Sequence, residues 1–171
     1  MDELDVLQRI NFMATAYIET TIPSYYTSRP ARDVVQMARQ THTKIWWDGG
    51  CSGFELFTSQ ETIDEASRGD CIVAAKRLEL LSQAAVLEIT PRVESLTKRL
   101  LAAGLVPASV ASDAIHIATA SVHRMDFLVT WNFKHIANPH IQQALREEVA
   151  SFGERLPVLC TPEELLRDED D

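Results

Sequence analysis

The sequence contains little cysteine. Its three cysteines, Cys51, Cys71 and Cys160, are odd in number and lie far apart among the 171 residues. A disulfide framework needs paired cysteines, and a Cys-x-x-Cys metal site needs them close together. The sequence fits neither class of protein, and the cysteines are predicted to be reduced and structural.

Long apolar runs and glycine-rich loops are also absent. No uninterrupted apolar stretch approaches the ~20 residues that span a bilayer. The acidic start of the chain does not have the pattern of a signal peptide, and no glycine-rich loop is present to cradle phosphates. The composition, 46% hydrophobic and 24% charged, is typical of a globular domain. We expect one soluble, cytoplasmic domain over residues 1–171, with no membrane contact.

Basic residues are scarcer than acidic ones. The 16 Lys and Arg against 25 Asp and Glu give a net charge of −9, which argues against a nucleic-acid binder. Nine of the acids, however, lie in residues 1–5 and in the acidic C-terminal end, 163–171. Residues 6–162 hold 16 acids and 15 bases, so the body of the chain is nearly neutral. A nucleic-acid substrate is therefore not excluded.

Short apolar segments alternate with segments of helical periodicity. Strands are predicted at residues 14–19, 54–58, 85–89, 127–130 and 157–160. Helices are predicted at 30–47, 59–68, 71–81, 91–103, 107–124 with a break near Ser112, and 139–152, and Pro23 is expected to stop regular structure after the first strand. This alternation predicts an α/β fold, a three-layer α/β/α sandwich around a parallel sheet of about five strands, with its core at about 14–160.

Several residues have the pattern of helix caps. Ser59, Asp70 and Thr90 each precede a helical segment, and Thr161 with Glu164 forms a capping-box pattern before a last short helix. Gly69 is expected to end the helix before it in the left-handed conformation.

Polar residues follow the predicted strands where ligands bind in such sheets. Glu19 comes directly after the first strand, and Asn132 lies just beyond the fourth. Glu65 is on the helix that follows the second strand, and Asp113 begins the core 113–118 of the helix predicted at 107–124. Carboxylates that share a small site repel one another unless a cation is present, so a cluster of these acids predicts a hard divalent metal, Mg²⁺ or Mn²⁺. Such a metal suits phosphodiester hydrolysis. The alternative for each acid alone is a cap or a solvated charge.

Four segments in order resemble the successive motifs of PIN domains, particularly the VapC-type toxins of bacterial toxin–antitoxin pairs. The segments are residues 17–26, 59–66, 113–118 and 128–132, and the resemblance covers about 15–160. It implies a PIN-like fold and a Mg²⁺- or Mn²⁺-dependent ribonuclease that leaves a 5′-phosphate and a 3′-hydroxyl. It also implies an RNA substrate, a cognate antitoxin protein, a homodimer and a bacterial cytoplasmic location.

The same resemblance assigns roles to individual residues. Glu19, Glu65 and Asp113 match the metal-binding acids, and Asn132 stands where many members have a fourth Asp. Thr20 and Thr130 stand where hydroxyls support the site. Glu19 is one methylene longer than the usual Asp, so it would reach the metal from a slightly different backbone position. Asn132 lacks a charge, which favours one-metal catalysis or a second ion recruited by the RNA phosphate. Asn132 also motivates the alternative of a weak or inactive PIN-like module that binds RNA or protein. A phosphohydrolase acting on small phosphates is a third alternative, disfavoured by the missing glycine-rich loop.

Basic and aromatic residues near these motifs have two interpretations each. The basic residues that could hold RNA beside the metal are Arg29, Arg32, Arg39 and Lys44, with a solvated helix face as the alternative. Trp46 and Trp47 could stack bases, but a core position is favoured. For His116, three residues after Asp113, a packing or supporting role is favoured over proton transfer.

Overall fold

Five parallel strands form one sheet in this computed structural model, which describes residues 13–166. The strand order is β3-β2-β1-β4-β5. The strands are β1 (Ala14–Ile18), β2 (Phe54–Ser59), β3 (Ala85–Leu87), β4 (Phe127–Val129) and β5 (Val158–Cys160). The predicted parallel sheet is confirmed, and the predicted strand boundaries differ by at most two residues.

The central strand β1 lies between β2 and β4. Ala14 is level with Phe54 on β2, and Ala16 is level with Phe127 on β4. Alternate residues of β1 point to opposite faces of the sheet, and Tyr17 and Ile18 are fully buried on the two sides. A strand covered on both faces is apolar throughout, which explains why the segment has no alternation of polar and apolar residues.

One layer of helices covers the face of the sheet to which Tyr17 and Leu128 point. It consists of α6 (Pro91–Ala102), α7 (Ala111–Val122) and α8 (Pro139–Ser151). The fully buried Leu96, Ile117 and Leu145 bring one apolar side chain from each helix into this part of the core.

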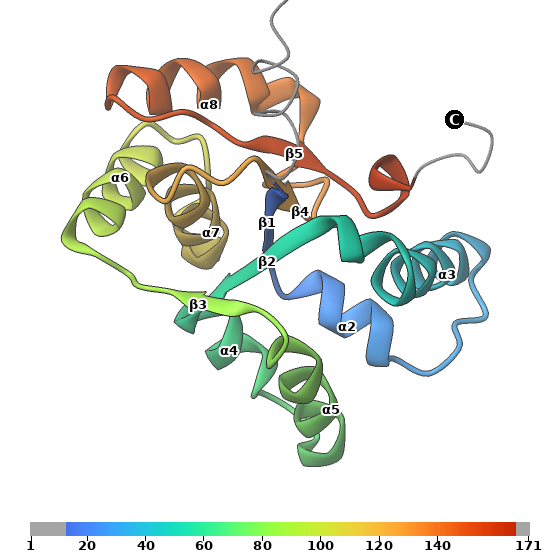
Figure 1. Ribbon diagram of the computed structural model, residues 1–171. Coiled ribbons are helices and arrows are strands. Elements are labelled where there is room, and N and C mark those ends of the chain that lie inside the picture. Colours follow the sequence, from blue (N-terminus) through green and yellow to red (C-terminus); the bar gives the residue numbers. More distant parts are fainter. Residues whose placement is uncertain (1–12, 167–171) are drawn as a thin grey trace, which may run out of the picture.

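A second layer covers the opposite face. It contains α2 (Thr21–Thr27), α3 (Val34–Asp48) and α5 (Cys71–Leu81), and Figure 1 shows this group apart from α6, α7 and α8. Trp46 and Trp47 are buried here against Ile18, as the core interpretation predicted. The short helix α4 (Gln60–Ala66) follows β2 and contacts both α5 and α7. The three-layer α/β/α prediction is confirmed.

Helix α2 was not predicted, and the expectation that Pro23 stops regular structure is wrong. Pro23 is the third residue of α2, after Thr21 and Ile22. The first N–H groups of a helix have no partner within the helix, so proline in this first turn removes no hydrogen bond. The predicted helix at 30–47 begins later, at Val34, where the Asp33 side chain accepts a hydrogen bond from the Gln36 N–H.

Three of the four predicted caps form cap hydrogen bonds. Asp70 accepts from the N–H groups of Ile72 and Val73, and Thr90 accepts from Val93. Thr161 and Glu164 exchange the two hydrogen bonds of a capping box. Ser59 occupies the predicted N-cap position of α4, but its side chain makes no cap hydrogen bond and lies instead 2.7 Å from the Tyr17 hydroxyl.

Short 3-10 turns and residues in the left-handed backbone conformation lie between the helices and strands. The turns cover Gly50–Gly53, Ala108–Val110 and Glu163–Leu165. The predicted break in the helix at 107–124 lies between the second of these turns and α7, just before Ser112. Gly69 has a φ of +90°, as expected of the residue that ends a helix. None of the helices described in residues 13–166 is long and apolar enough to cross a membrane.

Candidate functional site

The four polar residues predicted to form the site lie at or beyond the carboxyl ends of the strands. Glu19 follows β1 directly, and Asn132 is in the turn after β4. Glu65 lies near the end of α4, and Asp113 is in the first turn of α7. We call these four residues the acidic edge. His116 connects the three acids among them, because it contacts Glu65 and acts electrostatically on Glu19 and Asp113.

Glu19 is a buried carboxylate with only 3% of its surface exposed. The N–H of Thr21 donates to its Oε2 at 3.0 Å, and the Thr21 hydroxyl donates to the other oxygen. Burial raises the pKa of Glu19, and the nearby His116 and the hydrogen bonds from Thr21 and Thr130 oppose that rise. The start of α2 thus holds Glu19 through the backbone and side chain of one residue.

Glu65 is held by two side chains at a single oxygen. The Thr20 hydroxyl and the Nε2 of His116 both contact its Oε2, the latter at 3.0 Å. Burial alone would raise the pKa of Glu65, but the hydrogen bonds from His116 and Thr20 outweigh it and lower the pKa to about 2. Glu65 is therefore ionised at neutral pH.

His116 is the fully enclosed centre of this network. Burial alone would lower its pKa, but Tyr17, Glu65 and Glu19 around the ring raise the pKa well above its usual range. The imidazole is therefore protonated at neutral pH, and both ring nitrogens donate. Nε2 donates to Glu65, and Nδ1 donates to the Tyr17 hydroxyl at 2.9 Å. His116 places a positive charge among the carboxylates.

Tyr17 and Ser59 complete the network and were not predicted. The Tyr17 hydroxyl accepts from His116 and lies 2.7 Å from the Ser59 hydroxyl, to which it can donate. The signal in the sequence was the position of Tyr17, two residues before Glu19, which continues directly from the same strand. A strand residue two positions away points to the same face of the sheet as its neighbour.

Asp113 and Asn132 form a second pair at the acidic edge. Burial raises the pKa of Asp113, and a hydrogen bond with Asn132 and the nearby His116 oppose the rise. The Oδ1 of Asn132 accepts from the His135 N–H at 3.0 Å. Because this oxygen caps the turn, the amide nitrogen is the group that Asn132 presents to Asp113.

Thr20 and Thr130, predicted to support the site, lie in contact with its acids. The Thr20 hydroxyl donates to Glu65, and Thr130 bonds Glu19. The Thr130 hydroxyl also accepts from the Asn132 N–H at 2.8 Å, which links the turn after β4 to Glu19. Their functional roles stay predictions.

The donor chemistry of the acidic edge fits Mg²⁺ or Mn²⁺, because carboxylate oxygens are the ligands that these ions prefer. A bound cation would also oppose the raised pKa values of Glu19 and Asp113. Within residues 13–166, however, no three His, Cys, Asp or Glu side chains are grouped closely enough to hold a metal ion. Metal binding therefore requires the side chains of Glu19, Glu65 and Asp113 to lie closer together than they do in this structure.

The four predicted RNA-binding residues do not form one surface. Arg39 lies against the aromatic rings of Trp131 and Phe133, beside the acidic edge. Arg29 lines a hollow of about 380 Å³ between α2 and α3. Lys44 lines a different hollow, of about 630 Å³, with Lys76 of α5. Arg32 is exposed in the link between α2 and α3.

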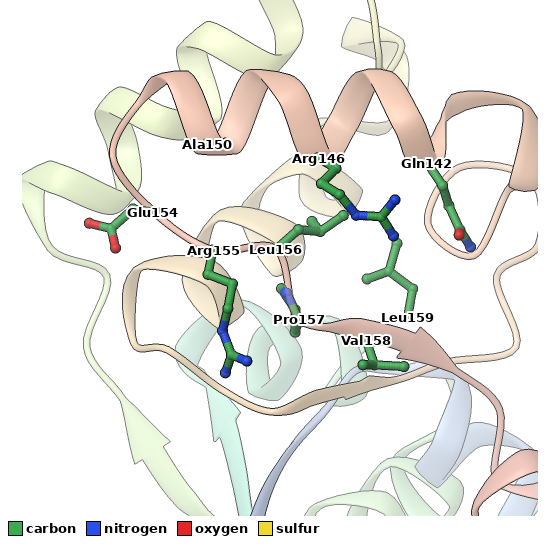
Figure 2. Close-up of a pocket in the computed structure, with 9 residues that line it drawn as sticks. All are labelled: Gln142, Arg146, Ala150, Glu154, Arg155, Leu156, Pro157, Val158 and Leu159. Carbon is green, nitrogen blue, oxygen red and sulfur yellow. The ribbon is translucent and has the colours of Figure 1, made fainter.

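Another hollow, of about 410 Å³, lies between α8 and β5 (Figure 2). It is lined by Gln142, Arg146, Ala150, Glu154, Arg155, Leu156, Pro157, Val158 and Leu159. None of these belongs to the acidic edge, and the segment that leads into β5 lies at the amino end of the strand. This position is not where ligands bind in parallel sheets.

Comparison with known proteins identifies a shared fold. No protein-family model and no curated protein matches the chain. Among solved structures, the chain is similar to one in the crystal structure of VapBC2 from Rickettsia felis bound to a DNA fragment from their promoter. That match has a TM-score of 0.50 and 13% sequence identity, and it covers 86% of this chain and 98% of that chain. At this identity, the comparison establishes the architecture.

Proposed function

We propose that this protein is a Mg²⁺- or Mn²⁺-dependent endoribonuclease and the toxin of a toxin–antitoxin pair. The observation that carries the proposal is the connection of Glu19, Glu65 and Asp113 through one buried histidine at the carboxyl edge of the sheet. Carboxylates at the ligand-binding edge of a parallel sheet suit phosphodiester hydrolysis with a hard metal. The fold shared with a chain of the VapBC2 complex supports the same conclusion.

Each acid of the proposed site is oriented by the chain's own groups. Thr21 and Thr130 hold Glu19, while Thr20 and His116 hold Glu65. Asn132 donates to Asp113. A metal held by these acids would activate water and stabilise the charge that develops on the phosphate. Cleavage is expected to leave a 5′-phosphate and a 3′-hydroxyl.

The positive charge of His116 reduces the repulsion among the carboxylates when no metal is bound. Nearby like charges disfavour one another in a site shielded from water, and an imidazolium between them offsets part of that cost. His116 thus acts as a positioning residue: it holds Glu65 and, through Tyr17, is anchored to β1.

The decisive experiment replaces one acid and one matched neighbour. Asp113→Asn is expected to abolish Mn²⁺-dependent cleavage of RNA by the purified protein and growth arrest on expression. Asp64→Asn is the control, because Asp64 is exposed on α4 next to Glu65 and its side chain bonds only Gln60. Equal RNA cleavage, or none at all, in wild type and Asp113→Asn would overturn the proposal.

A module that binds RNA or protein without cleaving is the second candidate. The observation that favours it is that the oxygens of Glu19, Glu65 and Asn132 already accept hydrogen bonds within the chain. Calorimetric titration with Mn²⁺ separates the two candidates. Saturable binding that Asp113→Asn weakens supports the nuclease, and no saturable binding supports the module.

The proposed partners are a cognate antitoxin and a second copy of the chain, in the bacterial cytoplasm. The VapBC2 structure supports the first, since a chain of similar fold is found there with a DNA fragment from their promoter. Co-purification with the product of a neighbouring short reading frame tests the antitoxin. Sedimentation of the purified chain tests the homodimer.

A further inference from the structure

We propose that Phe133 and Arg39 form a platform that binds an unpaired base of the RNA substrate and its phosphate. The inference rests on the proposed nuclease function and names substrate-binding residues beyond the acidic edge. We call the two residues, with Trp131 and Tyr25 behind them, the aromatic platform.

The geometry of Phe133 suits stacking. It directly follows Asn132 of the acidic edge, and 43% of its surface is exposed. Behind it lies the buried Trp131, with ring centroids 6.1 Å apart and planes at 63°. An exposed aromatic ring that is supported from behind loses little side-chain entropy when a base stacks on it.

Arg39 adds a positive charge to the same surface. Its guanidinium carbon lies 5.1 Å from the centroid of Phe133 and 5.7 Å from that of Trp131. Its Nη1 donates to the Tyr25 hydroxyl at 3.3 Å. No ion pair with a carboxylate is found for Arg39 within residues 13–166. A guanidinium carries five N–H donors, so others remain for a phosphate.

The platform continues into a hollow. Tyr25, whose ring meets Trp131 edge-on at 6.1 Å, also lines the 380 Å³ hollow between α2 and α3. Arg29 lies on the wall of that hollow with Gln36. A strand that stacks one base on Phe133 therefore has a further cation along the same surface for a neighbouring phosphate.

These features together select a nucleic acid strand with unpaired bases. A ligand for the aromatic platform needs a flat apolar face for Phe133 and a negative charge for Arg39, and a nucleotide has both. Duplexes hide the faces of their bases, whereas single strands expose them. Because Asn132 both bonds Asp113 and precedes Phe133, a base on the ring is held next to the acidic edge.

The test measures binding of a fluorescein-labelled RNA octamer by anisotropy, with EDTA present to prevent cleavage. Phe133→Ala and Phe133→Leu are expected to weaken binding about 5- to 150-fold, the effect of losing one base–aromatic stack. Phe133→Trp restores a flat ring and is expected to bind like wild type. Arg39→Gln should lower the slope of log affinity against log salt by about 0.7, the value for one phosphate contact to a single strand.

Two controls alter similar groups elsewhere. Arg146→Gln removes an exposed arginine of α8 (Figure 2), and Val158→Ala trims an apolar side chain that is 57% exposed on β5. Both are expected to leave the affinity for the octamer unchanged. A duplex of the same sequence is expected to bind weakly and to be insensitive to Phe133→Ala.

The outcomes separate this inference from the proposed function. If wild type does not bind the octamer, or if Phe133→Ala, folded by circular dichroism, binds within twofold of wild type, the aromatic platform is not a base-binding site. Binding that depends on Phe133 without any Mn²⁺-dependent cleavage would retain the platform and overturn the nuclease. Cleavage that requires Asp113, together with RNA binding that does not depend on Phe133, would retain the nuclease and rule out the platform.

Discussion

At the scale of single residues, the acidic edge depends on a buried ion pair. His116 is 1% exposed, and Glu65 retains 20% exposure of its side chain. Removing one partner of a buried pair leaves the other charge uncompensated. His116 also orders Tyr17, so its replacement affects both the strand β1 and the helix α4.

We therefore predict that His116→Gln lowers the free energy of unfolding by about 3 kcal/mol. The pKa of His116 is raised above 6.5, so its contribution is complete below pH 6.5 and is lost as pH rises through the raised value. The pKa of Glu65 falls from 4.5 to about 2, so its contribution is present above pH 4.5 and is lost as pH falls toward 2. His116 and Glu65 therefore stabilise the folded state most between pH 4.5 and pH 6.5.

Urea unfolding of wild type and His116→Gln below, within and above this pH window measures the difference. The difference in unfolding free energy should be largest within the window and smaller on both sides. A difference that does not change with pH would show that His116 acts by packing alone.

Sequence alone could place the acids of the edge and the supporting Thr20 and Thr130, but not the contacts of His116 and Tyr17. Glu19 and Asn132 are adjacent to apolar strands, so the rule on strand ends finds them. The contact of His116 with Tyr17 depends on how α7 is rotated against β1, which periodicity does not specify. The direction of the Asn132 amide depends on the His135 N–H, a contact formed only in the folded turn. Phe133 was missed because its exposure is a property of the tertiary fold.

At the scale of elements, most helices could be predicted from their caps and apolar spacing. Asp70 and Thr90 are caps in sequence and in structure. Helix α2 could not be predicted because it is short and contains Pro23, and its formation depends on burial of Ile22 and Pro23 against the sheet. The sequence could not show that Ser59, although it occupies the cap position of α4, bonds through its hydroxyl to Tyr17 of another strand.

This contrast gives a prediction about two residues at equivalent positions. Asp70→Ala should cost about 1 kcal/mol of unfolding free energy through loss of the α5 cap. Ser59→Ala should also destabilise, but through Tyr17. In double-mutant cycles with Tyr17→Phe, Ser59→Ala should show coupling of more than about 0.5 kcal/mol, and Asp70→Ala should be additive. Additivity for both would contradict the assignment of the Ser59 hydroxyl to Tyr17.

At the scale of the whole molecule, stability should be highest in the central strand. β1 has a neighbour on both sides and is buried on both faces, whereas β3 and β5 are edge strands with exposed Val86 and Val158. We predict that amides of β1 exchange with solvent only through global unfolding. Those of β3 should exchange with an apparent free energy lower by at least about 1 kcal/mol.

Native-state hydrogen exchange followed by NMR measures both classes of amide in one sample. Equal protection of β3 and β1 would show that the sheet opens only as a unit and would contradict the prediction.

The central position of β1 in the sheet also affects how the chain folds during its synthesis on the ribosome. β1 emerges early and can pair with β2 soon afterwards, but its other neighbour, β4, begins only at Phe127. The Thr15 hydroxyl of β1 donates to Asp126, the residue before β4, and this hydrogen bond spans 111 positions of the chain. A nascent chain therefore has an open strand edge through most of its synthesis, the condition in which other chains can pair with it. Because the acidic edge needs Glu19 from the beginning and Asn132 from beyond β4, no partly synthesised chain can assemble it before the second neighbour of β1 has emerged.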